Sequence, residues 1–138
     1  MKSAVTVDAS VFVNAFSPSE EGSDTSMEFL SQLSRERVPV IQPTLFLPEV
    51  AASIARKQDD TDAALELERE LKAFLNLTLI DLDEDLADFA SEIAAKHRLR
   101  GSDSVYAAVA LRFGTELISL DKEQLERLPK ILTVRMPE

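Results

Sequence analysis

Short β-rich runs alternate with helical patterns along the 138 residues of the chain. Apolar and β-branched residues fill five short runs, at residues 4–7, 38–42, 77–82, 117–120 and 131–134. Between these runs, apolar residues recur at the spacing of amphipathic helices. Strands separated by helices predict a parallel sheet covered on both faces. We therefore expect a three-layer α/β/α fold with a mainly parallel central sheet, and one domain over residues 1–138.

Polar residues mark where several of the expected helices begin. Asp24 and Thr61 each precede an apolar stripe at helical spacing, so each is expected to cap its helix. Either Ser102 or Asp103 is expected to cap the helix that contains the apolar run 105–111. That helix is apolar on nearly every side and should be buried. The last helix opens with an Asp-x-x-Gln sequence, the pattern of a capping box.

Composition narrows the class of protein. The chain has no cysteine, which excludes disulfides and thiolate zinc sites. No apolar run approaches the roughly 20 residues that cross a bilayer. The apolar stretch after Lys2 is too short for a signal peptide, and Asp8 interrupts it. We therefore expect a cytoplasmic protein that does not associate with membranes.

The chain is strongly acidic, with a net charge of -10. Such a charge is unusual for a protein that binds nucleic acid through its overall electrostatics. Binding to RNA would have to depend on metal ions, on local basic residues or on a partner. The acidity also has a simpler explanation, since net charge keeps a protein soluble.

Four acidic residues occupy suggestive positions. Asp8 and Asp121 each follow a short apolar run, while Glu49 and Asp103 each stand near the start of an expected helix. In parallel α/β sheets, ligands bind at the carboxyl ends of strands, near a switch in strand order. Carboxylates gathered there repel one another unless a cation joins them. The pattern suggests an all-oxygen site for a hard divalent metal ion, Mg²⁺ or Mn²⁺.

Each of these residues also fits an ordinary structural role. Asp8 and Asp121 fit helix N-caps. Glu49 would share one helix face with Ser53 and Arg56, which suits a solvated surface equally well. A carboxylate such as Asp103 is favoured by the dipole at a helix start. No single residue is specific, so the hypothesis of a metal site depends on the set of four.

These acidic residues lie in motifs that resemble those of PIN domains, and closely those of VapC-type toxin ribonucleases from toxin–antitoxin pairs. The motifs are VTVDAS around Asp8, PEV around Glu49, SDSVYAAVA around Asp103 and SLD ending at Asp121. The resemblance runs the full length of the chain and is most specific over residues 99–128. Ser119, in the last motif, stands where the family often has threonine.

The resemblance implies cleavage of RNA phosphodiester bonds that depends on Mg²⁺ or Mn²⁺. Two ions held about 4 Å apart can activate a water molecule and stabilise the leaving oxygen, so no Ser, Cys or His nucleophile is needed. Ser10 and Ser119 would support the ligands through hydrogen bonds. The implied catalytic metal ligands are Asp8, Glu49, Asp103 and Asp121, with Asp8 in the central position.

Basic residues near the motifs are predicted to hold RNA. Arg98 and Arg100 precede Asp103, and Arg56 follows Glu49. We expect these arginines to bind RNA phosphates at the rim of the site. A cluster of cations that simply ends the preceding helix explains Arg98 and Arg100 equally well. The only histidine in the sequence, His97, is interpreted as a packing residue at that helix end.

The resemblance also implies protein partners. A cognate antitoxin would place a chain segment, with an arginine, among the carboxylates. Apolar residues of two helices would pack in the core or supply surface for the antitoxin or for a homodimer. These residues are Met27, Leu30 and Leu33 in one helix and Leu67, Leu71 and Phe74 in the other.

Two other classes of function remain compatible with the sequence. One is a non-catalytic PIN-like module that acts by binding or assembly. The other is a different metal-dependent phosphotransfer enzyme or a phospho-acceptor domain, the latter with Asp121 and Lys122 at a strand end, and it leaves Glu49 and Asp103 without a role.

Overall fold

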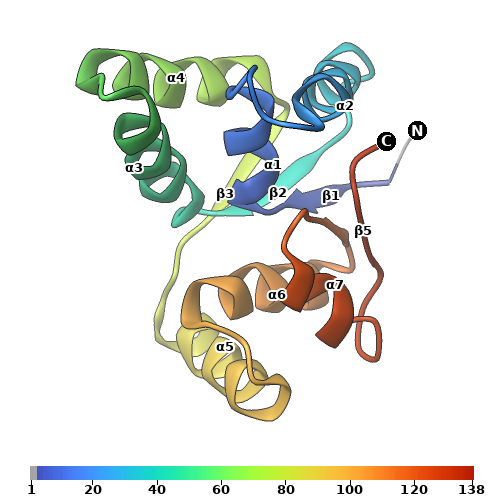
Figure 1. The fold of residues 1–138 in the computed structure, drawn as a ribbon. Coiled ribbons are helices and arrows are strands. Elements are labelled where there is room, and N and C mark those ends of the chain that lie inside the picture. Colours follow the sequence, from blue (N-terminus) through green and yellow to red (C-terminus); the bar gives the residue numbers. More distant parts are fainter. Residues whose placement is uncertain (1–2) are drawn as a thin grey trace.

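A five-stranded parallel sheet forms the centre of the computed structural model, which describes residues 3–138 (Figure 1). The strand order is β3-β2-β1-β4-β5, and every pair is parallel. The strands are β1 Val5–Val7, β2 Val40–Pro43, β3 Leu77–Ile80, β4 Glu116–Ile118 and β5 Val134–Arg135.

Helices cover both faces of the sheet. Figure 1 shows α1 to α4 on one side and α5 and α6 on the other, which confirms the predicted three layers. None of the helices within residues 3–138 is long and apolar enough to cross a membrane. The helices are α1 Ala9–Ala15, α2 Ser23–Arg35, α3 Phe46–Gln58, α4 Thr61–Phe74, α5 Glu84–His97, α6 Gly101–Phe113 and α7 Lys122–Arg127.

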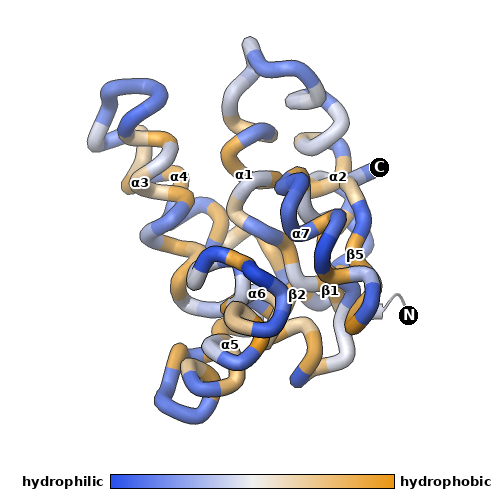
Figure 2. Tube along the Cα trace, turned by 60° about the horizontal axis from the view of Figure 1, so that its bottom comes forward, coloured by the Kyte–Doolittle hydropathy of each residue, from blue (hydrophilic) through white to orange (hydrophobic). Residues whose placement is uncertain are grey.

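The core follows the hydrophobic pattern. All three residues of β1 are buried, as suits the central strand of a covered parallel sheet. Helix α6 packs on β1, β2 and β4 on one side and on α5 on the other. Its residues 105–110 are therefore all buried, as predicted for a helix that is apolar all round. Hydrophilic and hydrophobic segments alternate along the helices that cover the sheet, as Figure 2 shows.

Three of the predicted helix starts are wrong by one to three residues. Gly22 precedes α2 with a φ of 82°, and Asp24 lies in the first turn. Asp60, rather than Thr61, caps α4 by accepting a hydrogen bond from the Ala63 N–H. Arg100 precedes α6, which places Ser102 and Asp103 inside the helix. In each case the residue type predicts a cap at one position, whereas the backbone conformation starts the helix at a neighbouring position.

The predicted last strand, 131–134, is also displaced. Strand β5 is only Val134–Arg135, at the edge of the sheet beside β4. Ile131 N–H donates to the Leu128 carbonyl at 2.9 Å, and Leu132 N–H donates to the same carbonyl at 3.1 Å. These bonds close a turn after α7, so Ile131 and Leu132 pack against the core from a turn instead of a strand.

The sheet reverses its strand order between β1 and β4. From β1 the chain builds β2 and β3 towards one edge, and it later builds β4 and β5 towards the other. Connections that diverge in this way leave a crevice at the carboxyl ends of the two strands. Asp8 follows β1 directly, and Asp121 lies shortly after β4. The fold therefore places both residues where a parallel sheet binds ligands.

A side chain fixes the end of the central strand. Strands β1 and β2 have one registered pair, Val5 with Val40. Beyond it, the buried amide of Gln42 accepts from the Val7 N–H at 2.6 Å and donates to the Val7 carbonyl at 2.7 Å. These two bonds replace the ladder where β1 and β2 separate, and they hold the backbone immediately before Asp8.

Candidate metal centre

Asp8 both caps α1 and faces the crevice. Its N–H donates to the Ile118 carbonyl at 2.8 Å, which ties it to β4. One carboxylate oxygen, Oδ2, accepts from the Ser10 N–H at 3.0 Å. The other, Oδ1, accepts from Nε2 of Gln124 at 3.1 Å. Asp8 is only 5% exposed, so these donors replace the water that a carboxylate would otherwise bind.

Glu49 is held in the first turn of α3. Its Oε1 accepts from the Tyr106 hydroxyl at 2.7 Å. Burial raises the pKa of the Glu49 carboxyl, the Tyr106 bond lowers it, and the charges of Asp8 and Asp103 raise it further. Burial, followed by the charges of Glu49 and Asp8, also raises the pKa of Tyr106 well above its ordinary value, so this hydroxyl keeps its proton for Glu49.

The predicted shared face of Glu49, Ser53 and Arg56 is confirmed. All three line an open groove of about 430 Å³ beside α1, together with Ser10 and Val13. Glu49 itself is half-buried and accepts a hydrogen bond from Tyr106.

Asp103 is the third residue of α6 and is buried. Burial raises the pKa of its carboxyl, and the charges of Asp8 and Asp121 raise it further. Hydrogen bonding and the charge of Arg100 act in the opposite direction. Asp103 therefore lies close enough to two other candidate carboxylates for their charges to oppose its ionisation.

Asp121 caps α7, as predicted. Its Oδ1 accepts from the Gln124 N–H at 2.9 Å. The capping box is only half formed, because the Asp121 N–H donates to Oγ of Ser119 instead of to the Gln124 side chain. The second carboxylate oxygen of Asp121 is left to face the crevice, where it meets Arg100.

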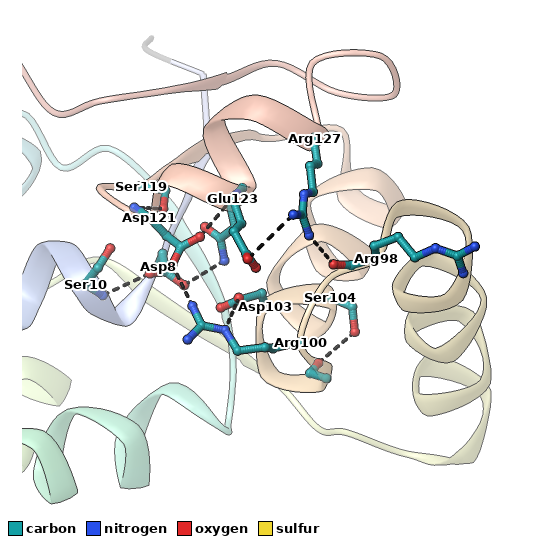
Figure 3. A network of polar contacts seen from close by, with 12 residues as sticks. Asp8, Ser10, Arg98, Arg100, Asp103, Ser104, Ser119, Asp121, Glu123 and Arg127 are labelled. Atoms are coloured by element: carbon teal, nitrogen blue, oxygen red, sulfur yellow. Dashed lines mark hydrogen bonds and ion pairs between the residues drawn. The ribbon is translucent and has the colours of Figure 1, made fainter.

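Arg100 bridges two of the carboxylates. Its Nε lies 3.1 Å from Oδ2 of Asp103, and its Nη2 lies 2.7 Å from Oδ2 of Asp121 (Figure 3). These contacts, led by the hydrogen bond with Asp103, raise the pKa of Arg100 above its already high ordinary value. The Arg100 side chain is nevertheless 67% exposed. A positive group thus occupies the place between Asp103 and Asp121 while remaining accessible to water.

The four predicted acidic residues therefore converge on one crevice. They come from the ends of β1 and β4 and from the first turns of α3 and α6. Within residues 3–138, no group of three or more acidic or histidine side chains has the spacing that would hold a metal ion. Their donor atoms are oxygens, the ligands that Mg²⁺ and Mn²⁺ prefer.

Both predicted supporting serines lie at this site. Oγ of Ser10 accepts from the Leu120 N–H at 3.1 Å, and Oγ of Ser119 accepts from the Asp121 N–H at 2.9 Å. Both hydroxyls thus hold the segment between β4 and α7. Their effect on Asp121 is indirect, since they position the backbone that carries it.

Arg98 does not face the carboxylates. It ends α5 in the left-handed conformation, with a φ of 56°, and its Nη1 donates to the Ala95 carbonyl at 3.1 Å. Figure 3 shows its side chain turned away from Asp103. Arg98 lines a separate groove of about 360 Å³ with His97, Arg127 and Lys130. Arg127 supports this groove by donating to the Arg98 carbonyl and by pairing with Glu123.

Sequence patterns do not reveal two residues that contact the carboxylates, Tyr106 and Gln124. Tyr106 is the only tyrosine of the chain, and its hydroxyl, within the apolar run 105–111, signals a need for a partner. Gln124 fits a capping box by its spacing, although its side chain reaches Asp8, 116 residues away. Interactions over such separations leave no local pattern.

A parallel α/β sheet with acidic residues gathered at its switch point defines the class of protein. The chain belongs to the PIN domain family, whose family model matches residues 5–131. No curated protein matches the chain significantly.

Solved structures of low sequence identity share the fold. The VapC20 toxin of Mycobacterium tuberculosis, described as cleaving the sarcin-ricin loop, has 17% identity and a TM-score of 0.70 over 86% of this chain and 90% of its own. A toxin–antitoxin complex from Klebsiella pneumoniae has 18% identity and a TM-score of 0.68 over 97% and 98%. VapBC2 of Rickettsia felis, bound to a promoter DNA fragment, has 13% identity and a TM-score of 0.67 over 98% and 99%.

Proposed function

We propose that this protein is a ribonuclease dependent on Mg²⁺ or Mn²⁺, and the toxin of a toxin–antitoxin pair. The convergence of Asp8, Glu49, Asp103 and Asp121 at the switch point of a PIN fold carries the proposal. These four carboxylates are the proposed metal ligands. A divalent cation bound there would offset the negative charge of the scissile phosphate and make water a better nucleophile.

The chain's own residues prepare this chemistry. Asp8 is pinned through both carboxylate oxygens, which suits the central ligand. Tyr106 orients Glu49, and Ser119 orients the backbone of Asp121. Carboxylates that hydrogen bonds already fix in place lose little conformational freedom when they bind a cation. This arrangement therefore favours tight binding of the metal ion.

RNA has to approach an acidic protein. The groove lined by Arg98, Arg127 and Lys130 is rich in positively charged side chains. It lies close to the crevice, since Arg98 is two residues from Arg100. We propose that this groove, together with Arg100, binds phosphates on one side of the cleavage point. Arg56, beside Glu49, is proposed to contact phosphates on the other side.

An antitoxin partner is proposed from the toxin–antitoxin complexes among the structural neighbours. The surface for it is an apolar groove of about 430 Å³ lined mainly by Phe16, Met27, Leu67, Leu71 and Phe74. Leu67 and Leu71 belong to the core, whereas Phe74 is 49% exposed and Met27 half-buried. The same surface serves a proposed homodimer if no antitoxin covers it.

Phe74→Asp tests this surface, with Phe113→Asp as the control. Phe113 is 43% exposed at the end of α6, outside the groove. Only Phe74→Asp should prevent co-purification with the protein encoded by the neighbouring reading frame, or dissociate the homodimer. Equal behaviour of the two variants would remove the groove from the proposal.

Cleavage assays with Asp8→Asn test the enzyme activity. Asparagine still accepts at a helix N-cap, so the fold should persist. Wild type should cleave RNA in Mg²⁺ or Mn²⁺ and not in EDTA, whereas Asp8→Asn should be inactive under all conditions. Wild type that is as inert as Asp8→Asn with several RNAs and both metals would falsify the proposal.

The occupation of the site by Arg100 favours one alternative function. A guanidinium held between Asp103 and Asp121 would suit a non-catalytic PIN module in which these carboxylates are structural. That function predicts no Mn²⁺ binding by the folded chain, and calorimetric titration with Mn²⁺ separates the two proposals directly.

A further inference from the structure

Gln124 connects two of the candidate metal ligands. It is the third residue of α7, and it is fully buried. Its backbone N–H donates to Oδ1 of Asp121 at 2.9 Å, and its side-chain Nε2 donates to Oδ1 of Asp8 at 3.1 Å. Gln124 therefore contacts both Asp8, which follows β1, and Asp121, which follows β4.

The orientation of this amide follows from its partner. An ionised carboxylate only accepts hydrogen bonds, so the NH₂ group of Gln124 has to face Asp8. The amide oxygen, Oε1, then points elsewhere. It is the only buried side-chain polar atom within residues 3–138 that lacks a hydrogen-bond partner.

The nitrogen of this amide serves the fold, because it donates to the buried carboxylate of Asp8, whereas the amide oxygen makes no hydrogen bond. An unpartnered buried acceptor lowers the stability of the fold. An unbranched apolar side chain of similar length would fill the space without that cost, although it would leave one oxygen of Asp8 without this donor. The capping box does not explain the residue, since the Asp121 N–H donates to Ser119 and the cap itself uses only the Gln124 backbone.

We propose that Gln124 is a positioning residue of the metal site, which fixes the carboxylate of Asp8 for a divalent cation. The inference rests on the proposed metal site and names a residue that serves it. The Ser10 N–H holds one oxygen of Asp8, and Gln124 holds the other, so the carboxylate plane cannot turn freely. Residues that orient metal ligands in this way typically contribute about 10–100-fold to metal affinity.

Gln124→Met provides the test. Methionine has nearly the same length and flexibility but cannot donate to Asp8. The readouts are the Mn²⁺ dissociation constant of the full chain by calorimetry and the thermal unfolding temperature in EDTA. We expect affinity to fall about 10-fold or more, while the variant stays folded in EDTA with a somewhat lower unfolding temperature, because Asp8 loses a buried donor. The control is Gln32→Met, a half-buried glutamine of α2 remote from the carboxylates, which should leave affinity unchanged.

Each result separates this role from the metal site itself. A folded Gln124→Met variant with wild-type Mn²⁺ affinity overturns the inference and leaves the metal site standing. A Gln124→Met variant that is not folded in EDTA shows that the fold requires the amide, and this result also overturns the inference. Gln124→Leu is the second variant for the same measurement. Wild type that binds no Mn²⁺ removes both proposals.

Discussion

Arg100 donates a hydrogen bond to Asp121 across 2.7 Å, although 21 residues separate them in the chain. The same guanidinium lies 3.1 Å from Asp103. A divalent cation that uses both carboxylates has to displace it. Because the Arg100 side chain is 67% exposed, the ion pairs contribute little to stability and exchange at low cost. Arg100 is thus a tethered counterion of Asp103 and Asp121 that the proposed metal ion would displace.

Arg100→Gln should therefore bind Mn²⁺ more tightly than wild type. The variant removes a competing cation from Asp103 and Asp121, and the gain should be a few-fold, in keeping with weak exposed ion pairs. Calorimetric titration measures it. Arg98→Gln makes the same charge change at a side chain turned away from the site and should leave the affinity unchanged. A weaker Mn²⁺ affinity for Arg100→Gln would show that Arg100 helps to assemble the site.

Tyr106→Phe should destabilise the protein and disturb Glu49. The variant removes the hydroxyl that donates to Glu49 at 2.7 Å inside the protein. The expected loss is about 1–2 kcal/mol of unfolding free energy, measured by urea denaturation in EDTA. In a Glu49→Gln background the same substitution should cost less, because the charged acceptor is gone. Equal costs in both backgrounds would contradict a specific Tyr106–Glu49 interaction.

The acidic cluster should make metal-free stability depend on pH. Burial raises the pKa of Glu49, so its contribution to stability is complete below its unfolded-state pKa and is lost as the pH rises through the raised value. In EDTA, Glu49→Gln should be more stable than wild type near neutral pH. This difference should shrink as the pH falls from about 8 to about 4.

Thermal unfolding of the two proteins in parallel measures this difference. Glu20 and Glu92, whose pKa values are lowered by Lys57 and Lys96, act in the opposite direction but are present in both proteins. Their contribution therefore cancels. A difference that grows as the pH falls would contradict the expected sign.

Removing positive charge from the basic groove should weaken RNA binding. In the cleavage-deficient Asp8→Asn background, Arg98→Gln with Lys130→Gln should lower RNA affinity several-fold in a fluorescence anisotropy titration. The salt dependence should also fall, by about 0.7 in the slope of log K against log salt for each phosphate of single-stranded RNA that the variant no longer binds. Arg69→Gln with Lys72→Gln, on α4, is the control. An equal effect in both pairs would indicate a response to net charge alone.

Much of the fold is predictable because its signals are local. The alternation of apolar runs and helical stripes predicts the layers and the parallel sheet, and both are confirmed. The burial of residues 105–110 follows from a helix without a polar face. Boundaries are less predictable, since Asp60 and Thr61 are both good caps and the path of the backbone chooses between them. Strand β5 is displaced from its expected position because the turn at Ile131 and Leu132 is as apolar as a strand.

The sequence by itself singled out four carboxylates as candidate ligands, since Asp8 and Asp121 follow strands and Glu49 and Asp103 open helices. Only the tertiary structure decided what holds them. Arg100 lies between Asp103 and Asp121, Tyr106 donates to Glu49, and Gln124 reaches Asp8 across the switch point. These interactions join residues distant in sequence, so no periodicity encodes them. They exist because the packing of α6 and α7 against the sheet brings unlike segments within hydrogen-bonding distance, where buried charge requires a partner.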